Sequence, residues 1–199
     1  MLGALVVSLA SIAWAGVPDL NTSTASIDPA ANGASVFNLP NGAGVALDQA
    51  FGVGGTVDAT ITLTLIDTTG DPIFGYPFED LWLETSLGGL TFCDGGTAAD
   101  ASTDIDGMTT WSNPLAAGGN SAGETTRVIV AGAPLAGAGL SLTFNSADIN
   151  GDLIVNLSDV ATFTQALATY TYDADFNNDG IINLSDVARF TQGIGTSCN

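Results

Sequence analysis

The sequence lacks histidine and lysine altogether, and its only basic side chains are Arg127 and Arg189. Against these two stand 21 acidic residues, so the formal net charge is −19 at pH 7. Nucleic-acid binding depends on Lys and Arg side chains that displace phosphate counterions, and anionic membrane surfaces repel such a chain. Histidine is also the usual general base and a common zinc ligand. We therefore expect no nucleic-acid partner and no histidine-based chemistry.

Other signatures of catalysis are missing too, because the sequence has no nucleophile elbow and no phosphate-binding loop. Two carboxylates can hydrolyse glycosides, and the candidates outside turns are Glu79, Asp80, Glu84 and Glu124. Glu79 and Asp80 are adjacent in an expected strand, so they would face opposite sides. Glu84 and Glu124 are better explained as solvated strand residues. We predict that the chain is not an enzyme.

Long apolar runs are scarce, and the longest opens the sequence at residues 1–15. This run ends in Ala13-Trp14-Ala15, which resembles a secretory signal peptide cleaved before Gly16, although a positive n-region is missing. It is shorter than the roughly 20 residues of a membrane span. A retained segment buried by a partner is the alternative. We predict a secreted protein, extracellular or at the cell surface, without membrane insertion after cleavage.

Cysteine is rare as well, with Cys93 and Cys198 as the two thiols of the chain. This usage fits an oxidising compartment. A Cys93–Cys198 disulfide would join the end of the chain to the domain before it, whereas an intermolecular bond would join neighbouring subunits. Two unpaired thiols are the third alternative. The sequence leaves the choice open.

Residues 16–144 have the pattern of a β domain. Apolar residues make up 46% of the chain, charged residues 12%, and there are 25 glycines, which is typical of a packed extracellular domain and not of a disordered acidic tail. Alternating short runs predict strands at 56–67, 79–84, 90–93, 108–112, 125–130 and 140–144. We predict an antiparallel β-sandwich, with residues 32–55 as a loop or arm able to add a strand to a neighbour.

Two segments of this region resemble bacterial Ig-like domains of the invasin type. Asp67, Gly70 and Pro72 match the family's D-x-x-G-x-P element, and 103–107 matches its later T-D-x-x-G hairpin. The resemblance implies a structural or adhesive spacer and carries no catalytic residues. A tight hairpin explains Asp104 and Asp106 better than a metal site.

Two acidic stretches of the same design lie 27 residues apart near the end of the chain, at 148–159 and 175–186. Oxygen-bearing side chains occupy loop positions 1, 3, 5, 9 and 12, as in a twelve-residue calcium loop. Position 7 supplies a backbone carbonyl, with its side chain expected in a core. The predicted ligands are Asp148, Asn150, Asp152, Ile154, Asn156 and Asp159 in the first loop and Asp175, Asn177, Asp179, Ile181, Asn183 and Asp186 in the second.

The duplication argues against a pair of ordinary solvated turns, so we predict two bound Ca²⁺ ions. Position 6 of such a loop needs a positive φ, which Gly180 accepts freely in the second loop. Leu153 holds this position in the first loop, at a cost of about 1–2 kcal/mol. We therefore expect the first site to be weaker or distorted.

Nearly identical segments follow the two loops, at 157–165 and 184–192. Their apolar residues recur at helical spacing and predict one amphipathic helix after each loop. These residues are Val160, Phe163 and Leu167 in the first repeat and Val187, Phe190 and Ile194 in the second.

Two tandem loop-helix units with Asp at position 12 resemble the type I dockerin family, and we assign residues 145–199 to such a module. The resemblance implies two calcium ions, folding around them, and docking onto cohesin domains of a scaffold. It also implies that loop positions 10 and 11 contact the partner, here Leu157, Ser158, Leu184 and Ser185. Because both repeats carry the same pair, two docking orientations would be allowed.

Three functions fit these observations. The favoured one is a secreted structural protein whose calcium module packs on the Ig-like domain of the next copy, since head-to-tail contacts of this kind give filaments. The second is docking onto a separate cohesin-like domain, as in a cellulosome. The third is a carbohydrate-binding accessory module, with Trp82 and Trp111 as a sugar platform, although core positions suit them better.

Overall fold

The computed structural model describes residues 16–198, so the predicted signal segment 1–15 lies outside the described residues. The strands are β1 Thr24–Ser26, β2 Ala34–Asn38, β3 Ala50–Gly52, β4 Gly55–Val57, β5 Ile61–Thr64, β6 Leu81–Thr85, β7 Leu90–Phe92, β8 Met108–Trp111, β9 Ala117–Gly119, β10 Thr126–Val130, β11 Ala133–Pro134 and β12 Leu142–Ser146. The helices are α1 Leu157–Ala166 and α2 Leu184–Gly193. Within residues 16–198, no helix has the length and apolar character needed to cross a bilayer.

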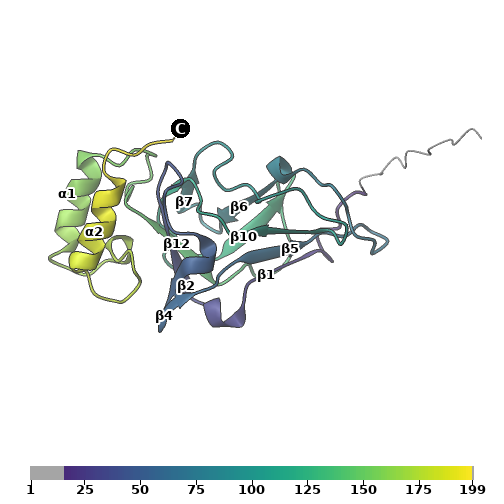
Figure 1. Cartoon of the computed structure of the whole chain (residues 1–199), viewed down its shortest axis with the longest axis horizontal. Coiled ribbons are helices and arrows are strands. Elements are labelled where there is room, and N and C mark those ends of the chain that lie inside the picture. The colour runs from purple at the N-terminus through teal and green to yellow at the C-terminus, as the bar shows by residue number, and fades with distance from the viewer. Residues whose placement is uncertain (1–15, 199) are drawn as a thin grey trace, which may run out of the picture.

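The strands form small sheets with the orders β1-β5-β8, β11-β10-β6, β12-β2-β3-β4 and β7-β9. Their inward side chains meet in one core, to which Ile61, Leu83, Trp111, Val128 and Phe144 contribute. The two helices lie side by side at one end of the molecule, and the described chain begins at the other (Figure 1). The prediction of a mostly β chain with two small helices is confirmed, and the arrangement is consistent with an Ig-like β-sandwich.

Strand β2 joins the two parts of the molecule because both of its faces are covered. All five of its residues are buried. Val36 points into the core of the sheets. Phe37 of the same strand and Leu39, which follows the strand, belong to a second core under the helices. Side chains of successive strand residues alternate in direction, so one strand serves both cores. Residues 32–55 are therefore not an arm, which corrects the sequence-based expectation.

Three further expectations are corrected. Residues 56–67 are not one strand but two, β4 and β5, separated by a turn in which the Asp58 carboxylate accepts the Thr60 N–H (2.9 Å). β12 pairs with β2 in parallel, so the sheets are not wholly antiparallel. Residues 78–80 form a 3₁₀ turn before β6, so Glu79 and Asp80 are not strand neighbours.

The two tryptophans of the suggested sugar platform have separate environments. Trp111 is fully buried, and its indole N–H donates to the Thr97 carbonyl (2.9 Å). Trp82 lies half-buried on the face of β6 opposite Leu81 and Leu83, and it donates to Glu84 (2.9 Å). Trp111 is therefore a core residue and does not form a platform with Trp82.

The structure joins Cys93 to Cys198 across 105 residues of sequence, which is the intramolecular alternative. Cys93 follows β7, and Cys198 lies on the tail after α2. The expected domain boundary between residues 144 and 145 falls inside β12. The helical part is thus attached to the sheets by a continuous strand, a shared core and a covalent bond.

Candidate metal centre

The first acidic loop begins where β12 ends, and backbone amides surround its leading carboxylate. Asp148 is fully buried. One of its oxygens accepts the Asp152 N–H (3.1 Å) and the other the Leu153 N–H (2.8 Å). The Asp152 carboxylate in turn accepts the Ile154 N–H (3.0 Å). Short acidic side chains therefore wind the backbone into a tight loop with its oxygens turned inward.

The second loop repeats these contacts at the corresponding positions. Asp175 is fully buried and accepts the N–H groups of Asp179 (3.1 Å) and Gly180 (2.8 Å). Asp179 accepts the Ile181 N–H (2.9 Å). The sequence duplication therefore corresponds to a duplication of local geometry.

Each loop ends in the first turn of a helix, and the same side chains serve as helix caps. The side-chain oxygen of Asn156 accepts the Ser158 N–H (2.8 Å), and the Asp159 carboxylate accepts the Asn156 N–H (2.9 Å). Asn183 and Asp186 repeat this reciprocal pair at the start of α2. Such a capping box satisfies amides that the helix leaves unpaired, so the acidic side chain at position 12 is fixed at the loop's end.

Position 6 of the first loop has the conformation expected from its place in the pattern. Leu153 has φ 67°, and Gly180 has φ 81° at the same position of the second loop. The leucine therefore stands in the left-handed region, which is unfavourable for a residue with a Cβ.

The apolar positions differ from the expectation. Ile154 and Ile181 at position 7 are 50% and 63% exposed and do not pack into a core. Val155, one residue later, is buried instead. The helices end at Ala166 and Gly193, so Leu167 and Ile194 lie beyond them and are exposed. The stripe that is buried consists of Phe163 and Phe190, which stack on each other with ring centroids 4.6 Å apart.

The carboxylates of the loops stand close enough to affect one another. Burial raises the pKa of Asp148, and the nearby Asp159 and Asp152 charges add to this effect, although N–H donors from Leu153 and Asp152 oppose it. Burial likewise raises the pKa of Asp186, with the charge of Asp175 adding to it. Each raised pKa means that the charged carboxylate is disfavoured where it stands unless a cation compensates it.

The first loop has the dimensions of a calcium site. One oxygen from each of Asp148, Asp152 and Asp159 lies within 4.8 Å of the others. Two oxygens bound to the same Ca²⁺ at about 2.3–2.6 Å are at most about 5.2 Å apart. The remaining predicted ligands also offer oxygen, which suits a hard cation and not zinc. Asn150 donates to the Asp152 carboxylate (3.2 Å), and Asn177 donates to the Asp179 carboxylate (2.8 Å). The oxygen donors present therefore fit calcium.

The β domain supports the first loop closely. The Gly119 N–H of β9 donates to the Asp148 carbonyl (2.7 Å). A Cβ on Gly118 would stand 1.8 Å from an Asp148 carboxylate oxygen, so only glycine fits there. The two glycines read as a turn in the sequence, and their contact with the loop has no sequence signal, because β9 lies 29 residues before Asp148 and has no alternating pattern.

The second loop is supported by side chains. Asn145 donates to the Asp175 carbonyl (3.1 Å), and the Tyr170 hydroxyl donates to its carboxylate (3.0 Å). Burial, followed by this bond, raises the pKa of Tyr170 to about 12. Asn178 donates to the Phe51 carbonyl (3.1 Å), and the Arg189 guanidinium lies 4.2 Å from the Phe51 ring centre. An open groove of about 640 Å³ borders this loop.

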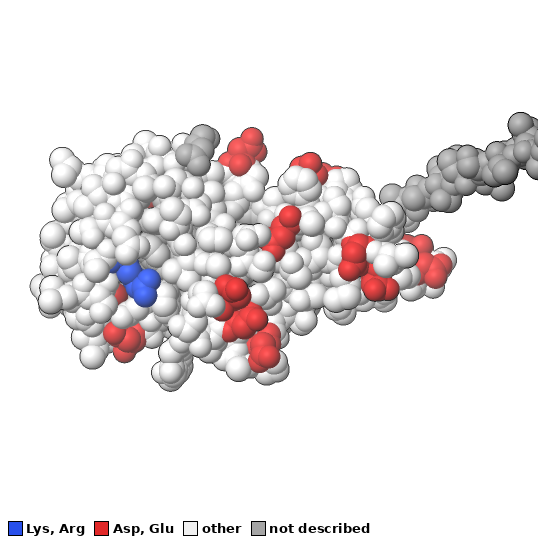
Figure 2. Space-filling model, viewed as in Figure 1, with Lys and Arg blue, Asp and Glu red and all other residues white. Residues whose placement is uncertain are grey.

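The residues expected to contact a partner are at the surface. Leu157 and Leu184 are 82% and 83% exposed, and Ser158 and Ser185 beside them are also exposed. Figure 2 shows acidic side chains spread over the visible face and a patch of basic atoms at the helical end. These residues are accessible to a partner, and their role as contact residues stays a prediction.

The carboxylates considered for glycoside hydrolysis have structural partners. Glu84 accepts the Trp82 indole N–H, and Glu124 accepts the backbone N–H groups of Leu87 (2.6 Å) and Gly89 (3.1 Å). Asp104 accepts the N–H groups of Asp106 (2.9 Å) and Met108 (2.8 Å), which is the pattern of a tight turn.

Comparison with protein-family models and with curated proteins finds no match. Among solved structures, the chain is similar to the crystal structure of the Lin-41 filamin domain, with 14% sequence identity and a TM-score of 0.33. The similarity covers 64% of this chain and 95% of that one. A likeness this weak supports no conclusion about function.

Proposed function

We propose that the protein is a secreted, non-catalytic calcium-binding structural protein, in which a dockerin-like pair of calcium loops is built onto an Ig-like β-sandwich. One observation carries this proposal: the loops at 148–159 and 175–186 repeat the same backbone contacts around a buried leading Asp. A chance acidic turn would not be reproduced together with the capped helix that follows it.

The role of the ions follows from the charge of the loops. Three carboxylates converge in the first loop, and the chain offers no lysine to neutralise them. A bound divalent cation supplies that neutralisation. Phe176 of the second loop packs in the core on β2 with Phe163 and Phe190, which lie on the helices that the two loops begin. Folding of the helical part is therefore linked to the metal.

Isothermal titration of the EDTA-stripped protein with calcium tests this step. We expect two binding events and a rise in the melting temperature, because a ligand at 100 times its Kd adds about 2.7 kcal/mol per site. Absence of binding, or a magnesium response equal to that of calcium, would show the proposal to be wrong.

We further propose that copies assemble head-to-tail into an extracellular filament. Leu157 and Leu184 begin α1 and α2, whereas Phe74 and Ile105, which are 58% and 78% exposed, lie on neighbouring loops of the β domain. A bond from the Gly75 N–H to the Thr103 carbonyl holds these two loops together. Contacts between two different surfaces of the same molecule continue from copy to copy and do not close.

The size of the purified chain in calcium and in EGTA, by light scattering and electron microscopy, tests assembly. We expect long polymers that dissociate on chelation. The double substitution L157S/L184S should keep both calcium sites and abolish polymers. The control L87S/V53S, at two other exposed apolar residues, should leave the polymers intact. A calcium-loaded monomer would contradict the filament and favour the second candidate function, docking onto a cohesin-like domain through Leu157, Ser158, Leu184 and Ser185.

A further inference from the structure

The paired strands β7 and β9 hold one side of the first calcium loop. At position 1, the Asp148 carbonyl accepts the Gly119 N–H of β9. β9 pairs with β7 through Phe92↔Ala117 and two further residue pairs. Cys93 follows β7 directly, and its N–H donates to the Ala116 carbonyl (3.0 Å). One side of the loop and the buried cysteine therefore belong to one rigid hairpin-like unit.

The C-terminal tail holds the other side of the loop. The Gly195 N–H donates to the Val155 carbonyl (2.9 Å), the Val155 N–H donates to the Thr196 carbonyl (2.9 Å), and Ile154 forms an antiparallel bridge with Ser197. Residues 154 and 155 are positions 7 and 8 of the loop, and position 7 supplies its carbonyl to the metal. The next residue of the tail is Cys198, which is bonded to Cys93.

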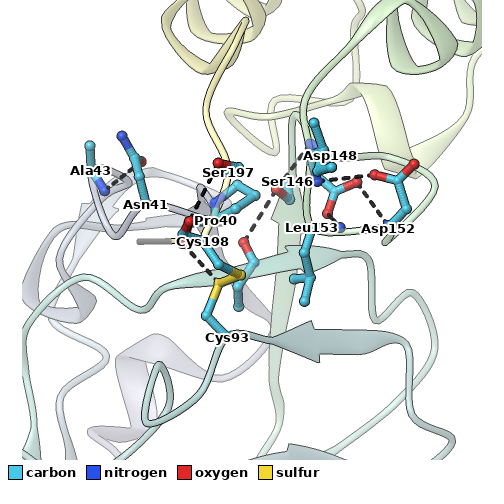
Figure 3. The surroundings of a disulfide bond; sticks show 12 residues. Pro40, Asn41, Ala43, Cys93, Ser146, Asp148, Asp152, Leu153, Ser197 and Cys198 are labelled. Atoms are coloured by element: carbon cyan, nitrogen blue, oxygen red, sulfur yellow. Dashed lines mark hydrogen bonds between the residues drawn. A yellow bond between two sulfur atoms is a disulfide. The ribbon is translucent and has the colours of Figure 1, made fainter.

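These contacts close a ring. It runs from Asp148 through β9 and β7 to the disulfide, and from there along the tail back to Val155. Figure 3 shows the disulfide between Cys93 and Cys198 and, in its surroundings, Asp148 of the loop and Ser197 of the tail. Two backbone hydrogen bonds alone hold residues 195–198 against the loop only weakly. The Cys93–Cys198 disulfide fixes this segment covalently to the end of β7. The second loop rests on the Asn145, Tyr170 and Asn178 side chains and has no bond to the tail among the described contacts of residues 16–198.

We propose that the Cys93–Cys198 disulfide is a positioning element for the first calcium site alone, so that the oxidation state of this pair sets the calcium affinity of one loop and not of the other. The inference rests on the proposed function, since it assumes that both loops bind calcium. It also implies that the ring offsets part of the strain at Leu153, because it preorganises the ligands of the first site. Loss of groups that orient metal ligands typically lowers affinity about 10- to 100-fold.

The coupling works in both directions. Reduction by a dithiol breaks the S–S bond, transfers two electrons and two protons to the sulfurs, and leaves the reductant as its own disulfide. If reduction weakens calcium binding tenfold, calcium must make reduction tenfold less favourable. For a two-electron couple, that factor lowers the reduction potential of the pair by about 30 mV.

The experiment compares the disulfide-bonded chain with C93A/C198A in two backgrounds that each silence one loop. D179A removes position 5 of the second loop and D152A the matched position of the first; both side chains are exposed. Calcium titration should show a 10- to 100-fold loss of affinity on cysteine removal in the D179A background. In the D152A background the affinity should not change, and terbium luminescence sensitised by Tyr170 should report the same second-loop affinity.

Equal losses in both backgrounds, or no loss in D179A, would overturn the inference. A failure of either background to bind calcium even with its disulfide intact would instead overturn the proposed function, and this inference with it. Should C93A/C198A not fold, the reduction potential of the unaltered chain, measured against a dithiol buffer in calcium and in EGTA, decides. A lower reduction potential in calcium supports the coupling between the disulfide and the first calcium site, and an unchanged reduction potential refutes it.

Discussion

Replacement of Gly118 by alanine should disable the first calcium loop although none of its ligand residues is changed. An added Cβ would lie 1.8 Å from an oxygen of the Asp148 carboxylate and 2.7 Å from its Cγ. Real Cβ contacts are at least 3.0 Å, so the two atoms must separate by about 1.2 Å. The whole window of calcium–oxygen distances is only about 0.3 Å wide. The Asp148 side chain is fully buried, so it has no adjacent solvent into which it could move.

We expect G118A to lose at least the 10- to 100-fold in first-site affinity that displaced ligand supports cost, or about 1.4–2.8 kcal/mol. Calcium titration in the D179A background measures it. G54A is the matched control, since a Cβ there meets nothing within 4 Å, and its affinity should equal that of the parent. An unchanged calcium affinity in G118A would mean that the β9 backbone moves and Asp148 keeps its position. That result would refute the rigid support that we infer.

Three further predictions concern stability. F176A should cost about 3–5 kcal/mol in urea unfolding, because Phe176 is fully buried against Phe37 with ring centroids 5.2 Å apart; a loss typical of surface changes would contradict the shared core. C93A/C198A should lose about 4.7 kcal/mol by loop-closure entropy for a 105-residue separation, and equal unfolding with and without a reductant would contradict this. Partial burial raises the pKa of Asp100, but hydrogen bonds from Ser112 and Asn113 outweigh it and hold the pKa below 3.8. The stability that this carboxylate contributes is present above its unfolded pKa and is lost as pH falls through the lower folded value. In EGTA, the difference in unfolding free energy between parent and D100N should therefore shrink below pH 3.8, and a constant difference would contradict the shift.

The loops and helices are predictable from the sequence because their determinants are local. The bonds from backbone amides to carboxylates that wind the first loop all lie within twelve residues, from Asp148 to Asp159. The positive φ at Leu153 and Gly180 follows from position alone. The tight turn at Asp104 was predictable for the same reason, since its acceptor and donors are at most four residues apart.

What the sequence does not reveal is non-local. β2 is buried on both faces because sheet residues cover one side and Phe163, Phe176 and Phe190 cover the other, yet its five residues have no alternation to mark them as a strand. The same is true of Gly118, whose importance comes from a carboxylate 30 residues away. Ile154 was expected inside because it is apolar, but the turn of the loop directs Val155 inward instead.

The two repeats are alike in sequence but are not equivalent in the molecule, and this difference has a physical origin. The first loop continues β12 and is fixed by backbone bonds and a covalent tie, whereas the second borders an open groove and is fixed by side chains such as Tyr170 and Asn178. Backbone support survives most substitutions, while side-chain support depends on the residue present. Affinity cannot therefore be ranked from loop sequence alone: Leu153 weakens the first loop by its own strain, but the surrounding ring reduces the entropy that its ligands lose on binding. The titration that separates the two loops measures which of these effects is larger.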